Sequence, residues 1–170
     1  MKNNIVLYKQ VKQQVEILGF NVVNFDFDRP WGGFLVIDEE QGQRFISTFF
    51  DQAKISFNQA RGIYNAIKLT PKIIIVNPKS RLSWQYHYRR KEIWSVYKGP
   101  IGVIKSKNDL ENPMQIYKEG DLIQFKEQER HRLIGLSKFG IVAEIWIHTD
   151  ISNPSNEDDI VRLQDDYKRN

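Results

Sequence analysis

Apolar residues recur at helical spacing near the start of the chain. Tyr8, Val11, Val15 and Leu18 follow one another at steps of three and four residues, which places them on one face of a helix. Gly19 comes soon after, where a helix commonly ends in a residue with a left-handed backbone. We therefore predict a helix over residues 4–18 that packs its apolar face on the rest of the protein.

After residue 30 the pattern changes to short runs rich in β-branched and aromatic residues, separated by glycine and proline. Many such runs at short intervals predict an antiparallel sandwich or barrel. Residues 38–70 mix aromatic and polar positions, and we interpret them as a loop, or as a lid with helical turns. The predicted strands cover residues 34–37, 73–76, 82–87, 93–97, 101–105, 114–117, 122–125 and 142–147.

The length of 170 residues fits one domain, with residues 1–28 as an N-terminal helix and lead-in and residues 29–170 as the main domain. Cysteine is absent, which excludes disulfides and thiolate metal sites. No apolar run reaches the roughly 18 residues of a membrane span, and the N-terminus lacks the apolar core of a secretory signal. We therefore expect a soluble, cytoplasmic protein that does not contact a membrane.

The charge balance also narrows the choice of partner. The chain carries 25 Lys and Arg against 21 Asp and Glu, a formal net charge of +4. The basic residues are scattered, whereas a nucleic-acid binder usually gathers them on one face. We therefore expect no nucleic-acid partner, although a few arginines could together bind a small anion such as a phosphate ester.

Four residues have the spacing of a metal site. Gln85 and His87 are two positions apart, so on a strand they point to the same face. Glu92 can return to that face from the next strand after a tight turn, and His131 can reach it from a neighbouring strand. Because histidines also occur in cores and on surfaces, the spacing alone leaves a purely structural role open.

The donor set determines which metals suit such a site. Imidazole nitrogens, a carboxylate and an amide oxygen favour a divalent ion over copper(I). We expect one ion, zinc in the first place, with manganese, iron, cobalt and nickel as alternatives. One or two coordination positions would stay open for water or substrate oxygens.

The same residues belong to a longer series of motifs. These motifs, in their order along the chain, resemble those of the type II mannose-6-phosphate isomerases. These enzymes are cupins that stand alone or form the C-terminal domain of bifunctional enzymes. The matching motifs are Arg-Pro-Trp-Gly at 29–32, Leu-Ser-x-Gln-x-His at 82–87, Arg-x-Glu-x-Trp at 90–94, His-Arg-Leu at 131–133, Glu-Asp-Asp-Ile-Val-Arg at 157–162 and Asp-Asp-Tyr at 165–167.

The resemblance implies a mainly β cupin fold, a double-stranded β-helix or jelly-roll-like barrel with an N-terminal helix. It also implies a metal held by Gln85, His87, Glu92 and His131, and interconversion of mannose 6-phosphate and fructose 6-phosphate. The chain departs from the family at residues 88, 89 and 93, where the family usually has histidine, and at residues 126–128, where the family usually has Pro-x-Gly. These departures leave the substrate open.

Further site residues follow from the resemblance and from residue chemistry. Arg162 matches the family's C-terminal arginine and is our first candidate for the active site. His148 is a candidate base because imidazole titrates near neutrality. Arg29, Arg90 and Arg132 are candidates for binding the substrate phosphate. The alternative roles are ordering of the entry strand for Arg29 and pairing with a metal ligand for Arg90, which just precedes Glu92.

Other functions compatible with these residues are isomerisation of another phospho-sugar such as a heptose phosphate, non-catalytic carbohydrate binding, and metal-dependent dioxygenase or epimerase chemistry on the same fold. The expected partner is a small-molecule sugar phosphate. The N-terminal helix could also support a homodimer.

Overall fold

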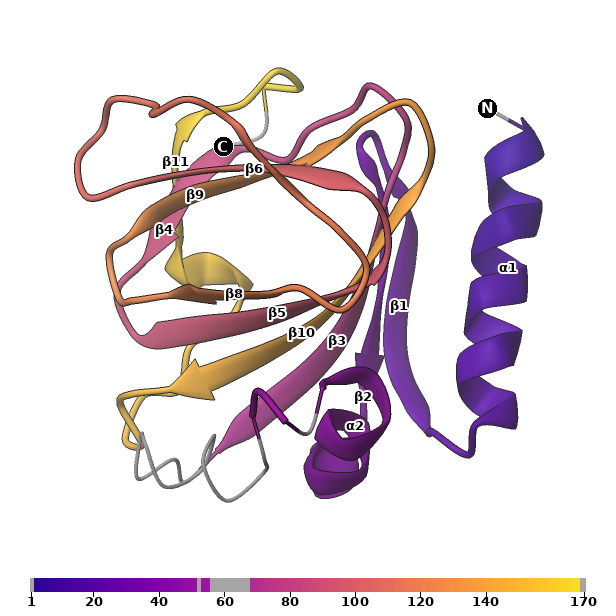
Figure 1. Ribbon diagram of the computed structural model, residues 1–170. Coiled ribbons are helices and arrows are strands. Elements are labelled where there is room, and N and C mark those ends of the chain that lie inside the picture. The colour runs from indigo at the N-terminus through magenta and orange to yellow at the C-terminus, as the bar shows by residue number, and fades with distance from the viewer. Residues whose placement is uncertain (1, 52, 56–67, 169–170) are drawn as a thin grey trace.

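The computed structural model describes residues 2–51, 53–55 and 68–168 (Figure 1). Two α-helices and two short 3-10 helices accompany eleven strands in this part of the chain. The helices are α1 (Lys2–Ile17), η1 (Glu39–Gln41), α2 (Gly42–Phe49) and η2 (Glu157–Asp159). The strands are β1 (Val22–Arg29), β2 (Gly32–Ile37), β3 (Leu69–Val76), β4 (Trp84–His87), β5 (Arg90–Lys98), β6 (Ile101–Ser106), β7 (Gln115–Tyr117), β8 (Leu122–Phe125), β9 (Arg130–Gly135), β10 (Gly140–His148) and β11 (Ile160–Gln164).

The strands form two antiparallel sheets. The larger sheet has the order β1-β2-β3-β10-β5-β8, and the smaller sheet has the order β11-β4-β9-β6-β7. Figure 1 shows the two sheets facing each other, with α1 alongside β1 and both helices outside the space between the sheets. The mainly β cupin architecture with an N-terminal helix is confirmed. The expected closed barrel is not: among the described strands, the two sheets stay separate ladders.

The central strands of the larger sheet are buried on both faces. Along β3 and β10, alternate residues such as Ile75 and Ile145 pack toward α1 and α2. The residues between them, such as Ile74 and Val142, join a second apolar cluster that lies between the sheets. This two-sided burial explains why these strands read as nearly continuous apolar runs in the sequence, although the sheet is antiparallel.

The helix α1 confirms the predicted N-terminal helix. Tyr8, Val11 and Val15 are all buried in the cluster on the outer face of the larger sheet. Gly19 follows two residues after the last helical residue, Ile17. Its φ of +83° is a conformation that glycine adopts without the steric cost of a side chain. Backbone hydrogen bonds from Gly19 N to Glu16 O, 2.8 Å, and from Phe20 N to Val15 O, 3.2 Å, close the C-terminal turn.

Three strands were not predicted. Strand β1 is an edge strand with mostly polar or partly exposed positions, so its sequence lacks a strong apolar run. In β9 polar residues interrupt the pattern, and His131 is the second residue of this strand, which neighbours β4 as predicted. Residues 160–164 form the short strand β11 beside β4.

The region 38–70 proves to be partly helical. Helix α2 buries Phe45, Ile46 and Phe49 against the outer face of the larger sheet, so this part is a packing element and not a lid. The remaining part of the predicted lid, residues 56–67, lies outside the described residues. Neither described α-helix combines the length and apolar composition that a membrane span requires.

This packing predicts the effect of shortening the central side chain of α2. Phe45 is fully buried, so we expect Phe45→Ala to lower the free energy of unfolding by about 3–5 kcal/mol through lost contacts and a cavity. Urea denaturation measures the change. Gln43→Ala, at an exposed position of the same helix, is the matched control and should shift stability by less than about 0.5 kcal/mol. Equal stabilities for the two variants would contradict this packing.

Candidate metal centre and adjoining pocket

Three potential ligands converge between the two sheets. His87 ends β4 and His131 lies in β9, both in the smaller sheet, whereas Glu92 lies in β5 of the larger sheet. Each of the three side chains is only 2% exposed. One donor atom from each of them lies within 4.8 Å of the others. The predicted convergence of these three residues is thus present in the fold.

The distances between the donor atoms suit a shared cation. Glu92 Oε1 lies 3.2 Å from His87 Nε2, and Glu92 Oε2 lies 3.2 Å from His131 Nε2. Ligands bound to one ion at about 2.0–2.2 Å are separated by roughly 3 Å or slightly more. The three side chains therefore have the spacing of ligands around one ion.

The protonation of His131 supports this interpretation. Its Nδ1 lies 2.9 Å from the backbone carbonyl of Glu129, an oxygen that can only accept, so Nδ1 carries the hydrogen. Its Nε2 lies 3.2 Å from Glu92 Oε2 and has no hydrogen-bond partner among the described residues, so a neutral ring presents a lone pair there. Two buried acceptors that face each other are stabilised by a cation between them. The Glu129 carbonyl thus fixes the orientation of the His131 ring. Metal-binding histidines commonly donate their second ring N–H to such an acceptor.

Gln85, the predicted fourth ligand, lies beside the three. It pairs directly with His131 across β4 and β9, and its Nε2 lies 3.5 Å from His87 Nε2. Its Oε1 accepts a hydrogen bond of 2.5 Å from Ser83. Ligation through the amide oxygen would require this amide to turn, so the role of Gln85 stays a prediction.

Arg90 is the nearest permanent positive charge. Its Nε donates to Glu92 Oε1 at 2.7 Å, and its Nη2 lies 3.0 Å from His87 Nε2. Burial by itself would raise the pKa of Glu92, but the facing His87, Arg90 and His131 outweigh burial and hold this pKa well below its ordinary value. Of the three, only the guanidinium keeps its charge at every relevant pH. The carboxylate is therefore ionised, as a metal ligand must be.

His87 is in the form that binds metals. Burial, helped by the charge of Arg90, lowers the pKa of His87 to about 4. The imidazole is consequently neutral at neutral pH, and a neutral ring nitrogen is the species that coordinates a metal ion.

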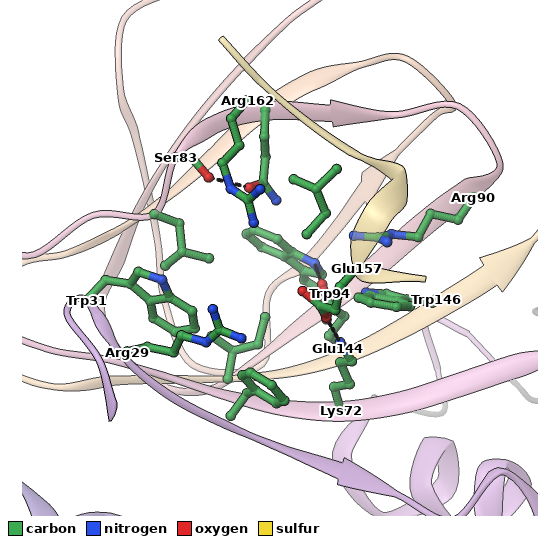
Figure 2. Close-up of a pocket in the computed structure, with 15 residues that line it drawn as sticks. Arg29, Trp31, Lys72, Ser83, Arg90, Trp94, Glu144, Trp146, Glu157 and Arg162 are labelled. Carbon is green, nitrogen blue, oxygen red and sulfur yellow. Dashed lines mark hydrogen bonds and ion pairs between the residues drawn. The ribbon is translucent and has the colours of Figure 1, made fainter. Parts of the chain in front are cut away.

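A pocket adjoins this centre between the sheets. The space free of protein atoms in this pocket, its open mouth included, is about 550 Å³. Figure 2 shows Arg162 and Arg29 reaching into it from different strands, with Lys72, Glu144 and Glu157 grouped together. Its lining residues are Arg29, Trp31, Phe34, Lys72, Ile74, Leu82, Ser83, Gln85, Arg90, Trp94, Glu144, Trp146, Glu157, Ile160 and Arg162.

The pocket has more positive than negative groups. Arg29 is ion-paired with Asp26 at 2.8 Å, and Lys72 with Glu157 at 2.8 Å. The turn of the Arg-Pro-Trp-Gly motif positions Arg29, the cation of the first ion pair. Its Gly32 approaches β3 so closely that a Cβ would lie 1.9 Å from Ile75 O.

The indole of Trp146 is covered on both sides by cations. Lys72 Nζ lies 3.4 Å from the ring centroid, and the guanidinium carbon of Arg90 lies 3.5 Å from it. Such cation–π contacts are favourable when they are desolvated. With its faces engaged, Trp146 is not free to stack on a sugar ring, but it positions two cations at the wall of the pocket.

Glu144 is a functional candidate that the sequence did not reveal. It faces the pocket from β10, is 3% exposed, and its Oε1 accepts a 2.8 Å hydrogen bond from Trp94 Nε1. The same Trp94 Nε1 lies 3.2 Å from Glu92 Oε2, so one indole N–H connects the two carboxyl groups. Burial, together with the charge of Glu92, raises the pKa of Glu144 to about 8. An acidic residue within the apolar run of residues 140–148 was the available signal.

Two predicted site residues lie outside the pocket. His148 ends β10, and its Nε2 lies 2.8 Å from Thr70 Oγ1, which in turn donates to Glu39. Burial lowers the pKa of His148 to about 4, so it is neutral at neutral pH. Arg132 donates to Glu111 at 2.7 Å and to Gln164 O at 3.1 Å. Neither residue is part of the pocket lining, so nothing in their placement supports the predicted roles.

Comparison with known proteins shows the family to which the chain belongs. Residues 51–165, more than half of the chain, match the family model described as mannose-6-phosphate isomerase C-terminal. The chain belongs to this family. The match includes all four predicted metal ligands, together with Arg90, Glu144 and Arg162. No protein with curated annotation matches the chain.

Solved structures similar to this isomerase-family domain are cupins and related proteins. A point-mutant form of the oxalate decarboxylase from Bacillus subtilis aligns with a TM-score of 0.53 and 12% identity over 79% of this chain and 29% of that chain. A cupin 2 conserved barrel protein from Salinispora arenicola aligns with a TM-score of 0.42 and 15% identity over 49% of this chain and 65% of that chain. The alignments thus span less than two thirds of each matched chain, 29% and 65% respectively. Identities this low show the fold alone.

The departure at residues 126–128 lies next to the centre, where Gln128 N donates a 2.8 Å hydrogen bond to the backbone oxygen of His87. The departures at residues 88, 89 and 93 place no side chain at the site. Tyr88 is half exposed, and Arg89 lies 3.9 Å from Asp159 rather than beside the metal ligands. Ile93 is buried in the cluster on the opposite, helix-covered face of the larger sheet. None of these three residues lines the pocket. These three substitutions therefore leave the candidate centre unchanged.

The centre makes a prediction about metal binding. We expect His131→Ala to weaken zinc binding by at least about 100-fold, because it removes a ligand whose ring is already oriented. Isothermal titration with zinc ions, after treatment with a chelator, measures the affinity. His148→Ala is the matched control, since it removes another buried histidine outside the centre. Equal loss of affinity in both variants would contradict the assignment.

The pKa of Glu144 predicts a pH dependence of stability. The folded protein keeps this proton up to about pH 8, whereas an ordinary carboxyl loses it near pH 4.5. The stabilising contribution of the neutral form is therefore complete below pH 4.5 and decreases as pH rises toward 8. Urea denaturation of the metal-free protein should show Glu144→Gln gaining stability relative to the wild type between pH 5 and pH 8. A difference that is constant with pH would contradict the buried, protonated state.

Proposed function

We propose that the protein is a metal-dependent sugar-phosphate isomerase that interconverts an aldose phosphate and a ketose phosphate, with mannose 6-phosphate and fructose 6-phosphate as the first candidate pair. The observation that carries this proposal is the position of the His87, Glu92 and His131 centre beside a pocket lined by cations. Membership of the mannose-6-phosphate isomerase family supports the reaction class.

The pocket suits a ligand rich in acceptor oxygens. Arg29, Lys72 and Arg162 present cationic groups that can bind phosphate. The indole nitrogens of Trp31 and Trp146 are buried in the pocket wall and have no hydrogen-bond partner among the described residues. Buried donors without partners are costly, and a ligand that accepts from them recovers this cost. A phosphorylated polyol supplies both the anion and the acceptors.

His87, Glu92 and His131 would hold the metal ion, with Gln85 as the proposed fourth ligand. When bound, such an ion acts as a Lewis acid that stabilises negative charge on sugar oxygens. Because Glu92 serves this ion and Arg90, it is poorly suited to accept a proton from carbon.

Glu144 is the proposed proton-transfer group. Its ionised form can take the proton from C2 of the open-chain aldose, while the electron pair of that C–H bond forms the C1=C2 bond and the C1=O pair moves onto O1, which gives an enediolate. The proton is then returned to C1, and the proton of the O2 hydroxyl moves to O1, so that C2 becomes the carbonyl carbon of the ketose. A carboxyl whose pKa lies near the working pH suits this role.

The test is isomerisation of mannose 6-phosphate by the zinc- or manganese-loaded protein. We expect turnover in the wild type and a loss of about 10²–10⁴-fold in kcat for Glu144→Gln, with metal binding retained. His131→Ala should lose turnover and metal together. Tyr88→Phe, outside the pocket, is the control that keeps activity.

The outcomes separate the candidate functions. Turnover of a heptose phosphate but not of mannose 6-phosphate would keep the isomerase and change its substrate. Saturable binding of sugar phosphates without turnover would contradict an isomerase and support a carbohydrate-binding protein. Turnover that is unchanged in the metal-free protein would contradict a metal-centred reaction.

A further inference from the structure

Arg90 lies inside the metal centre rather than beside it. Its side chain is 2% exposed, and each of its three guanidinium nitrogens makes a polar contact. Nε donates to Glu92 Oε1 at 2.7 Å, and Nη2 donates to His87 Nε2 at 3.0 Å. Nη1 donates to Ser155 Oγ at 3.1 Å and to Asn156 O at 3.2 Å.

Two of these contacts use the atoms that a metal ion needs. The lone pair of His87 Nε2 can serve one partner, either an N–H of Arg90 or an ion. Glu92 Oε1 has more than one lone pair and can keep its contact with the guanidinium while the carboxylate binds an ion. The conflict between Arg90 and a metal is therefore confined to His87.

The metal-free centre contains a charge that must be balanced. A buried carboxylate without a partner is strongly destabilising, and removal of one partner from a buried ion pair typically costs about 3–5 kcal/mol. Arg90 supplies that partner at 2.7 Å. Its contacts to Ser155 and Asn156, and its stacking on Trp146 at 3.5 Å, keep the guanidinium in place.

We propose that Arg90 is a displaceable internal cation: it holds Glu92 and His87 in position in the metal-free protein and competes with the metal ion for His87. Arg90 is thus a positioning residue, and its positive charge opposes a second cation at short range. The chain can fold without metal, with a lower metal affinity as the consequence. This inference rests on the metal centre of the proposed function, but not on the isomerase reaction.

The decisive variants are Arg90→Met, which keeps the length of the side chain but removes the charge and donors, and Arg90→Lys, which keeps the charge with a single nitrogen. Zinc titration of the chelator-treated protein measures affinity, and thermal unfolding with and without zinc measures the rescue. Arg132→Met is the matched control, because it also removes a buried ion-paired arginine, but outside the centre.

For Arg90→Met we expect a melting temperature in the metal-free state that falls by more than about 5 °C, as loss of a buried charge partner implies. We expect zinc affinity to rise at least about tenfold, and zinc to restore most of the lost stability. Arg90→Lys should bind zinc more tightly than the wild type, because one nitrogen cannot serve both Glu92 and His87. Arg132→Met should lose stability without a gain in zinc affinity or rescue.

Zinc affinity that is equal or weaker in both Arg90 variants would overturn the proposal. If Arg90→Met folds only with zinc, the proposal is supported; if it does not fold even with zinc, Arg90→Lys decides by its affinity alone. A wild type that binds zinc but does not isomerise sugar phosphates would contradict the proposed reaction and leave this test valid. Absence of zinc binding in the wild type and in both Arg90 variants would overturn the inference and the metal centre together.

Discussion

The carboxylate of Glu92 is buried between two sheets, and an ionised carboxylate is stable there only with a partner of opposite charge, which is Arg90 or a metal ion. His87 and His131 face it from the smaller sheet, and Arg90 faces it from its own strand. Most of the polar structure in this half of the molecule follows from that requirement. Glu92 of the larger sheet therefore lies 3.2 Å from His87 and from His131 of the smaller sheet. These contacts connect the two sheets beside the pocket.

The larger sheet can support this arrangement because its two faces have separate roles. The face toward α1 and α2 is predominantly apolar, with Ile73, Ile75 and Ile145 among its contributors. The opposite face is apolar at one end, where Ile74 and Val142 pack, and polar at the other, where Lys72 and Glu144 lie. The outer cluster provides the hydrophobic stabilisation that allows several charged groups to remain buried between the sheets.

Much of the centre was predictable from residue spacing. The two-residue step from Gln85 to His87 fixed their common face, and the motif order indicated the cupin fold and the approach of His131. The position of Arg90 just before Glu92 indicated that these two residues could pair. Position on a strand does not reveal contacts across the space between sheets, so the contact of Arg90 with His87 could not be predicted. Glu144 was missed because the apolar residues around it read as a core strand, although an acid on its inward face was a usable signal.

The limits of prediction for the fold have similar causes. Strand β1 lies at a sheet edge and has few buried positions, and β11 is short, so neither has a strong apolar pattern. The region 38–70 was read as a loop or lid because its aromatic residues lacked an obvious partner. The aromatic residues of α2 pack on the outer face of the larger sheet. This is a tertiary contact that local sequence does not encode.

The central claim is that one divalent ion binds between His87, Glu92 and His131. Anomalous diffraction at the zinc absorption edge, from crystals of the zinc-loaded protein, tests it most directly. The account predicts a single strong peak about 2.0–2.2 Å from His131 Nε2, from a carboxylate oxygen of Glu92 and from His87 Nε2. A zinc-saturated crystal with no peak between these side chains, or with its peak elsewhere in the protein, would contradict the account.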